Sequence, residues 1–192
     1  GLVSSGMSYE GLVGYAYKAG IYNIYVDNSY FGNGSHVGGI VGKLDNATVS
    51  NCVSHAVVDG NNHIGGIAGY SVWGGIYRAE NFGRVVANNY VGGIVGWSDC
   101  TRTQNCVNFG LVYGKGNSQC GGIVGHADHK DIIYNCYNTG TVYTTGGDSQ
   151  RGAILGFTES HGIFKRDEGT TMDQCYYLSG CAGSKGAYGK NG

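Results

Sequence analysis

The sequence predicts an all-β fold: a parallel β-solenoid of about six coils, each 27–31 residues long and built from three short strands. Three observations predict it. A glycine-rich word recurs at nearly constant spacing, a second word follows each copy in fixed phase, and the residues between them are strand formers such as Val, Ile, Tyr and Thr. We expect a right-handed coil, because connections between parallel strands generally have that hand.

The first word is Gly-Gly-Ile-Val-Gly. It reads GGIVG at 38–42, 92–96 and 121–125, GGIAG at 65–69, GAILG at 152–156 and EGLVG at 10–14, so units begin near 10, 38, 65, 92, 121 and 152. A unit this short cannot bury its own apolar face, so the units must stack, with strands about 4.8 Å apart. Glycine repeated inside strands indicates close backbone approach, and we expect β-branched substitutions at Gly66 or Gly93 to be costly.

The second word supplies two columns that we expect to line the interior. The first column contains Ile24, Cys52, Ala79, Cys106, Cys136 and Cys175. The second column, six residues further along, contains Tyr30, Val58, Val85, Val112, Val142 and Cys181. Between the columns stand Asn81, Asn108 and Asn138, each followed two residues later by Gly. We expect each Asn to cap backbone groups and to bond along the stack, and each Gly to supply a positive φ.

The seven cysteines are interpreted mainly as packing residues. Five of them fall in the interior columns, the number is odd, and no CxxC pair with zinc-site spacing occurs. Disulfides between stacked neighbours such as Cys106 and Cys136 are the alternative, because adjacent coils bring their Cα atoms near enough. Cys100 and Cys120 lie outside the columns and could pair with each other.

An acidic column stands three residues after the closing glycine. It includes Asp99, Asp128 and Glu159 on consecutive coils. Stacked carboxylates repel one another, and a hard cation such as Ca²⁺ would relieve that repulsion, which makes these three residues the candidate metal ligands. The alternative is that they are turn residues whose side chains point into water. Apart from this Ca²⁺ hypothesis, we expect no cofactor.

An aromatic column stands one residue after the closing glycine. Its aromatic members are Tyr15, Tyr70, Trp97 and Phe157, with Lys43 and His126 at the other two positions. A surface stripe of this kind could bind sugar rings or another protein. The alternative is that the rings stack across coils and stabilise the solenoid itself.

Catalytic signatures are missing from the sequence. It contains no HExxH, GxSxG or Walker-type word, and the acidic column has no obvious paired general acid. The segment His126–Asp131 looks like a metal site in isolation, but we interpret it as a variable turn, and the histidines at 36, 55, 63 and 161 appear in different turns. We therefore expect no enzymatic activity.

Composition narrows the choice of partners. The net charge is −1 with no basic run, so nucleic acid is not an expected partner. No apolar stretch approaches the roughly 20 residues of a membrane helix, so we expect no membrane insertion in this segment. Because the chain begins with Gly1 rather than Met, we expect it to be a piece of a longer protein with neighbouring domains. Residues 1–181 are predicted to form one solenoid domain, and residues 182–192 a flexible tail or a truncated next coil.

The two words together resemble the GLUG motif, a repeat of bacterial surface proteins. The pattern is VGGIVG followed by NCYNTGTV, and it is clearest at 91–112 and 120–142. Proteins with this motif include haemagglutinin-type adhesins and immunoglobulin-A-cleaving metallopeptidases, in which the repeats are an accessory region. The zinc-binding helix of those peptidases is absent here, so the resemblance does not imply protease activity.

The resemblance implies a non-enzymatic, extracellular module at the bacterial cell surface, acting in adhesion or as a structural stalk, with a glycan or a host or cell-surface protein as its partner. The alternative is a fragment of a carbohydrate-active β-helix that binds or cleaves polysaccharide.

Overall fold

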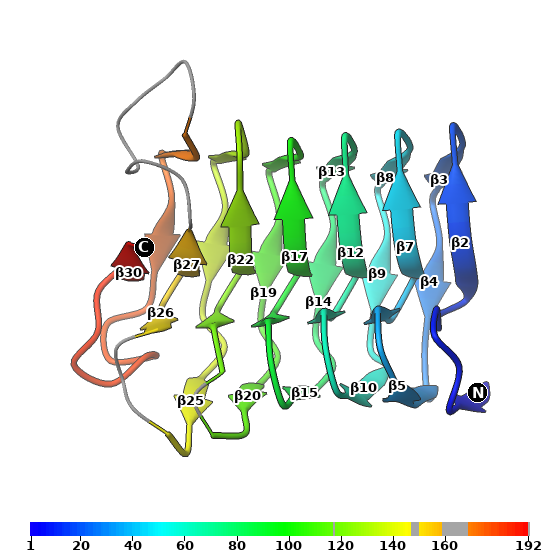
Figure 1. Cartoon of the computed structure of the whole chain (residues 1–192), viewed down its shortest axis with the longest axis horizontal. Helices are drawn as coiled ribbons and strands as arrows, with labels where there is room; N and C mark the ends of the chain where they lie inside the picture. The colour runs from blue at the N-terminus through cyan, green and yellow to red at the C-terminus, as the bar shows by residue number, and fades with distance from the viewer. Residues whose placement is uncertain (117, 147–149, 159–168, 192) are drawn as a thin grey trace.

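The computed structural model describes residues 1–116, 118–146, 150–158 and 169–191. These residues form thirty strands and no α-helix, and the strands belong to five parallel sheets that run the length of the stack (Figure 1). The predicted parallel β-solenoid is confirmed. The predicted three strands per coil are wrong, because successive strands such as β2 to β6 belong to five different sheets.

The strands are short, and we number the sheets in the order in which one coil visits them. Sheet 1 contains β2 (Val13–Tyr17), β7 (Val41–Asp45), β12 (Ala68–Val72), β17 (Val95–Asp99), β22 (Val124–Asp128), β27 (Leu155–Thr158) and β30 (Tyr188–Asn191). Sheet 2 contains β3 (Gly20–Tyr22), β8 (Thr48–Ser50), β13 (Gly75–Tyr77), β18 (Arg102–Gln104), β23 (Ile132–Tyr134) and β28 (Thr171–Asp173). Sheet 3 contains β4 (Tyr25–Val26), β9 (Val53–Ser54), β14 (Glu80–Asn81), β19 (Val107–Asn108), β24 (Tyr137–Asn138) and β29 (Tyr176–Tyr177).

The remaining two sheets complete the coil. Sheet 4 contains β1 (Val3–Ser5), β5 (Tyr30–Gly34), β10 (Val57–Gly60), β15 (Val85–Ala87), β20 (Val112–Gly114) and β25 (Val142–Thr144). Sheet 5 contains β6 (Val37–Gly38), β11 (Ile64–Gly65), β16 (Val91–Gly92), β21 (Cys120–Gly121) and β26 (Arg151–Gly152). The glycine word spans the corner from sheet 5 into sheet 1, since its first Gly ends one strand and its Val begins the next.

Single left-handed residues make three of the corners. One column of positive-φ residues follows sheet 1 and contains Lys18, Asn46, Trp73, Cys100 and His129. A second lies between sheets 2 and 3 and contains Asn23, Asn51, Arg78, Asn105, Asn135 and Gln174. A third precedes sheet 5 and contains His36, His63 and Tyr90. Asparagine is several-fold enriched in this region of φ/ψ space, which explains why it recurs in the second column. These corners divide the coil into more strands than the sequence pattern indicated.

The interior columns match the prediction in the central coils. Cys52, Cys106 and Cys136 are fully buried. Each directly precedes the first residue of a strand in sheet 3, and these strands pair in register along the sheet. Val58, Val85, Val112 and Val142 form one continuous register column.

The prediction fails at both ends of the valine column. Val58 pairs with Phe31 rather than with Tyr30, because the first unit has one extra residue before sheet 4. In the central coils the amide of Val112 donates to the carbonyl of Thr141, the residue just before its register partner Val142. At the other end of the column, the amide of Val142 donates in the same way to the carbonyl of Cys181. The residue equivalent to Val142 is therefore Ala182, which is buried, and Cys181 stands one position earlier.

The predicted asparagine ladder is present. Asn81 Nδ2 donates to Asn108 Oδ1, and Asn108 Nδ2 donates to Asn138 Oδ1, both at 2.8 Å, while each Asn also caps the Gly two residues later. The predicted positive φ at these glycines is wrong, since none of the three has one. Glycine is required for a different reason: a Cβ at Gly110 would lie 1.9 Å from the carbonyl oxygen of Gly83 on the adjacent coil.

One buried column of sheet 5 has a charged residue at each of its two ends. It runs from Glu10 through Val37, Ile64, Val91 and Cys120 to Arg151. Glu10 is 2% exposed and accepts a hydrogen bond from the amide of Gly32 at 3.0 Å. Beyond Arg151, β30 still pairs with β27 and extends sheet 1 by one strand.

Candidate ligand-binding face

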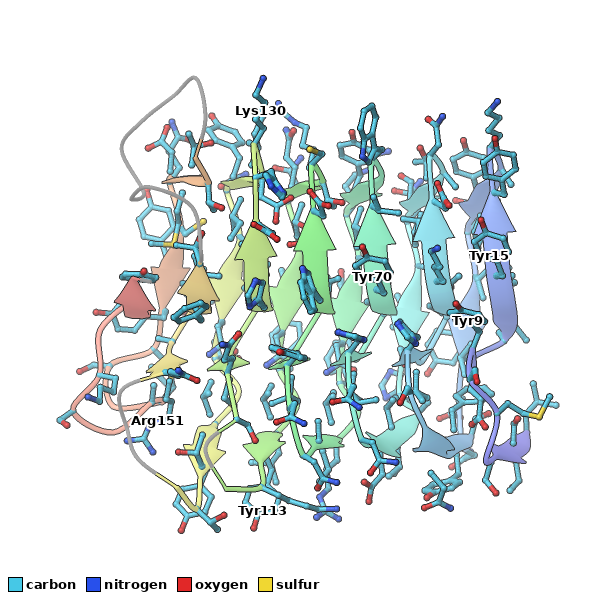
Figure 2. All side chains as sticks on the ribbon, viewed as in Figure 1. Tyr9, Tyr15, Tyr70, Tyr113, Lys130 and Arg151 are labelled. Atoms are coloured by element: carbon cyan, nitrogen blue, oxygen red, sulfur yellow. The ribbon has the colours of Figure 1, made fainter. Side chains whose placement is uncertain are left out.

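The predicted aromatic stripe is one continuous ladder on sheet 1. Tyr15 pairs in register with Lys43, and the ladder continues through Tyr70, Trp97 and His126 to Phe157. These residues alternate with buried neighbours such as Ser71 and Ser98, so they share the outer face of the sheet. Figure 2 shows Tyr15 and Tyr70 standing on this face, two coils apart.

A second aromatic column, which the sequence analysis did not identify, lies beside the first. It contains Tyr9, His36, His63 and Tyr90, with ring-centroid distances of 5.0, 4.5 and 5.1 Å between successive members. Each stands two residues before the first glycine of the word, or its equivalent, and this spacing could have revealed it. His36 and His63 do lie in turns, as expected, but in the same turn of consecutive coils rather than in different turns.

The two columns interlock. The ring centroid of His63 lies 4.8 Å from that of Trp97 and 5.7 Å from that of Tyr70. The centroid of Trp97 lies 4.8 Å from that of Tyr90 and 4.4 Å from that of His126. We call this double column the aromatic face. His126 was predicted to lie in a variable turn; instead it lies within β22 and is fully buried. Its Nδ1 contacts Oε1 of Gln119, which continues the second column.

The imidazoles of the aromatic face are held neutral. Burial lowers the pKa of His63 to about 3, with His36 and His126 contributing further. Burial likewise lowers the pKa of His126 to about 4, and it also lowers the pKa of His36. Because burial removes the hydration that a charged imidazole requires, and the Asp99 carboxylate offsets this only in part at His126, the central rings act as packing groups at neutral pH.

Exposure divides the aromatic face into two parts. At the C-terminal end Phe157 is 9% exposed and His126 is not exposed at all. At the N-terminal end Tyr9 is 44% and Tyr15 48% exposed. Beside them Tyr17, which stands two residues after Tyr15 in β2 and pairs in register with Asp45, is 55% exposed. The rings of the later coils therefore stack across coils, as one of the two alternatives predicted, and the rings of the first coil remain accessible.

A polar group adjoins the exposed end. The hydroxyl of Tyr15 donates to Asp45 Oδ2 at 2.8 Å, which raises the pKa of that tyrosine. Lys43 Nζ lies 3.7 Å from the same carboxylate oxygen and sits between two rings, 5.3 Å from the centroid of Tyr15 and 5.7 Å from that of Tyr70. The arrangement combines aromatic surface with a carboxylate and an ammonium group, which is typical of sites that bind polar rings.

The candidate metal ligands are only partly brought together. Asp99 and Asp128 pair in register, as predicted, and His129 Nδ1 lies 3.0 Å from Asp99 Oδ1 and 3.4 Å from Asp128 Oδ1. Glu159 lies outside the described residues. Within the part of the chain that the structure describes, no group of three His, Cys, Asp or Glu side chains has the arrangement of a metal site. In this structure an imidazole bridges the two carboxylates.

A buried carboxylate close to the acidic column was not predicted. Asp131 is 1% exposed and accepts hydrogen bonds from the Ser98 hydroxyl and the Thr101 amide, both at 2.5 Å, and from the Asp128 amide at 3.2 Å. Burial raises its pKa well above the usual value for Asp. Because its oxygens serve the backbone and side chains of two coils, Asp131 organises the corner after sheet 1.

All seven cysteines are free thiols. Cys52, Cys106, Cys120, Cys136 and Cys181 are buried, and Cys100 and Cys175 are partly exposed. Cys100 and Cys120, considered as a pair from the sequence, are not bonded. Burial raises the pKa of Cys120 to about 12, which suits a packing residue rather than a nucleophile.

No helix of the described residues is long and apolar enough to cross a membrane. None of the curated proteins compared with this sequence matches it. The family model of the GLUG motif matches residues 33–58 and 116–143. One solved structure is similar: a protein from Bacteroides ovatus described as a "putative immunoglobulin A1 protease", with 18% sequence identity and a TM-score of 0.47.

The similarity covers 83% of this chain but only 58% of the Bacteroides ovatus protein. Each of the two segments that match the family model contains one glycine word followed by the second word, so the motif corresponds to one coil of the stack. The chain is thus a β-solenoid that carries GLUG motifs.

Proposed function

We propose that this chain is a non-enzymatic extracellular module of a bacterial surface protein, a rigid stalk that also carries an adhesive face. The observation that carries the proposal is the division of the aromatic face. Its later coils are closed by ring stacking, whereas Tyr9, Tyr15 and Tyr17 form a row of rings, with centroids 6.1 and 6.5 Å apart, beside Asp45 and Lys43. Exposed aromatic rings beside polar groups are typical of binding surfaces.

The stalk role rests on how the coils are joined. Every sheet continues through at least five strands in a nearly constant register, and the buried asparagine ladder adds side-chain hydrogen bonds between three coils. In a solenoid each coil contacts its neighbours, so stability grows along one axis. A stack of this kind is suited to hold a surface away from the body to which it is attached.

The carboxylates of the described residues support a non-enzymatic role. Asp45 accepts from Tyr15, Asp99 contacts His129, and Asp131 accepts three hydrogen bonds in the interior. Hydrolysis of a glycosidic bond requires a general acid opposite a second carboxylate with substrate between them. Here each of these three carboxylates contacts a group on a neighbouring coil.

A glycan array combined with a polysaccharide-cleavage assay tests the proposal. We expect binding to at least one glycan or host-cell surface and no release of reducing ends. Release of reducing ends would contradict the proposal and favour a carbohydrate-active β-helix. Absence of binding to glycans and to intact host cells would leave a passive spacer and would also contradict it.

A further inference from the structure

We infer that the exposed end of the aromatic face binds the pyranose rings of an extended glycan chain, through Tyr9, Tyr15 and Tyr17. The inference rests on the proposed adhesive function and names its ligand class. It starts from a row of three rings. The centroids of Tyr9 and Tyr15 are 6.1 Å apart and those of Tyr15 and Tyr17 6.5 Å apart, with interplanar angles of 30° and 25°.

The strand geometry produces this row. Tyr15 and Tyr17 are two residues apart in β2 and so project from the same side, and Tyr9 comes from the segment that precedes the glycine word. Figure 2 shows Tyr9 and Tyr15 close together at the N-terminal end of the stack, in front of β2. Near-parallel rings in a line can each stack against the apolar face of one sugar in a chain, and tyrosine loses little side-chain entropy when it does so.

Polar groups flank the rings where sugar hydroxyls would lie. Asp45 offers a carboxylate with lone pairs beyond those that Tyr15 and Lys43 engage. Lys43 and Lys18 offer ammonium donors, and Lys18 Nζ lies 5.1 Å over the ring of Tyr17. A sugar hydroxyl both donates and accepts, so it needs acceptors and donors together, and this end of the face provides both.

The arrangement of the rings favours a thin ligand over a broad protein partner. Tyr9, Tyr15 and Tyr17 form one row, whereas the next rings along the ladder, from Tyr70 onward, pack against one another. A stable protein–protein interface covers about 800 Å² on each partner and concentrates its energy in a dry centre. A single row of rings with charged neighbours matches a polymer that lies along the strand.

The test uses isothermal titration calorimetry with cellohexaose, chitohexaose, xylohexaose and a 1,4-linked hexagalacturonate as probes. The last probe shows whether the lysines favour an acidic chain. We expect at least one probe to bind the unmodified protein, and Tyr15→Ala and Tyr17→Ala to weaken that binding about tenfold each. Asp45→Asn should weaken it by a smaller factor, because the rings stay in place while the carboxylate that holds Tyr15 and Lys43 and would accept from sugar hydroxyls loses its charge.

The chain offers a matched control in Tyr143, which is 49% exposed on sheet 4 and stacks with Tyr113 at 5.7 Å. Tyr143→Ala removes a ring of equal exposure, and we expect its binding to stay within about twofold of the unmodified protein. Thermal melts of all variants check that each remains folded. Equal losses from Tyr143→Ala and Tyr15→Ala would overturn the inference, as would a lack of binding to every probe.

The two proposals fail differently. If the protein adheres to host cells whose glycans have been removed enzymatically, and Tyr15→Ala adheres equally well, the adhesive function stands and the glycan site is wrong. If a probe is cleaved during the titration, the non-enzymatic function is wrong. If hexaose binding depends on Tyr15 and Tyr17 and the probe stays intact, both proposals are supported.

Discussion

Gly93 and Asn108 face each other across the interior of the solenoid. A Cβ added to Gly93 would lie 2.4 Å from Cγ of Asn108 and 2.1 Å from the carbonyl oxygen of Gly122 on the adjacent coil. The same contact joins Gly66 to Asn81 and Gly122 to Asn138. In the last glycine word the second Gly is replaced by Ala153, and Tyr177 stands in register with Asn138 where the next Asn would be. The two words of the repeat therefore occur together because their residues occupy one shared space.

Gly93→Ala should destabilise the protein by about 3 kcal/mol, because its methyl group must displace backbone as well as the asparagine ladder. Urea unfolding followed by far-ultraviolet circular dichroism measures this loss. Gly186→Ala is the matched control, since the nearest atom to its added Cβ is the Tyr177 hydroxyl at 3.8 Å. Equal stability of the two variants would contradict the packing of Gly93 against Asn108.

Asn108→Asp should be more destabilising at pH 8 than at pH 4. Nδ2 of Asn108 donates to Gly110 and Asn138, and an ionised carboxylate in its place can donate to neither. We expect a loss of about 3 kcal/mol at pH 8 that shrinks as the buried acid takes up a proton. Asn105→Asp changes a residue whose side chain accepts an exposed hydrogen bond from Asn135, so it should reduce the free energy of unfolding much less. A loss from Asn108→Asp that does not depend on pH would show that this side chain is not confined to the interior.

Stability should fall as the pH drops from 7 to 5, because His63 and His126 have folded-state pKa values of about 3 and 4. Their unfolded pKa lies near 6.5, so the unfolded chain binds protons that the folded chain excludes, and each imidazole should account for up to about 2 kcal/mol of the loss. Protonation of Asp131, whose pKa is raised, acts in the opposite direction.

Comparison of His63→Gln and His126→Gln with the unmodified protein isolates the imidazole contribution. We expect a flatter dependence of the unfolding free energy on pH in both variants. Parallel pH profiles for all three proteins would mean that the two buried rings do not sense the transition.

Arg78→Asn should stabilise the protein by about 0.5–1 kcal/mol, since Asn tolerates the left-handed conformation better than Arg. Arg78 has a φ of 47° in a column whose neighbours Asn51 and Asn105 have φ values of 56°. Its hydrogen bond to Asn51 at 2.6 Å is exposed, so the loss of that bond costs little, and the loss of its part-buried bond to the Ser50 hydroxyl at 2.9 Å holds the gain within this range. Thermal melting checks the prediction, and Arg102→Asn within β18 should give no increase.

The candidate site could be predicted in part. The stripe from Tyr15 to Phe157 followed from spacing alone, because parallel stacking in register turns a sequence column into a spatial ladder. Spacing did not indicate which of these rings are exposed, since exposure depends on the second column of His36, His63 and Tyr90. The glycan site inferred at Tyr9, Tyr15 and Tyr17 also depends on Lys43 and Asp45, whose contacts with the rings are tertiary.

The sequence by itself determined that this chain is a parallel β-solenoid, which columns line its interior in the central coils, and that an asparagine ladder joins them. Period and phase suffice for these features, because every coil repeats the same local geometry. Only the tertiary structure decided the number of strands per coil, the pairing of Val58 with Phe31 instead of Tyr30, and the burial of His126. Each of these depends on where a single residue turns the chain or on which side chain covers another, and contacts between coils settle both.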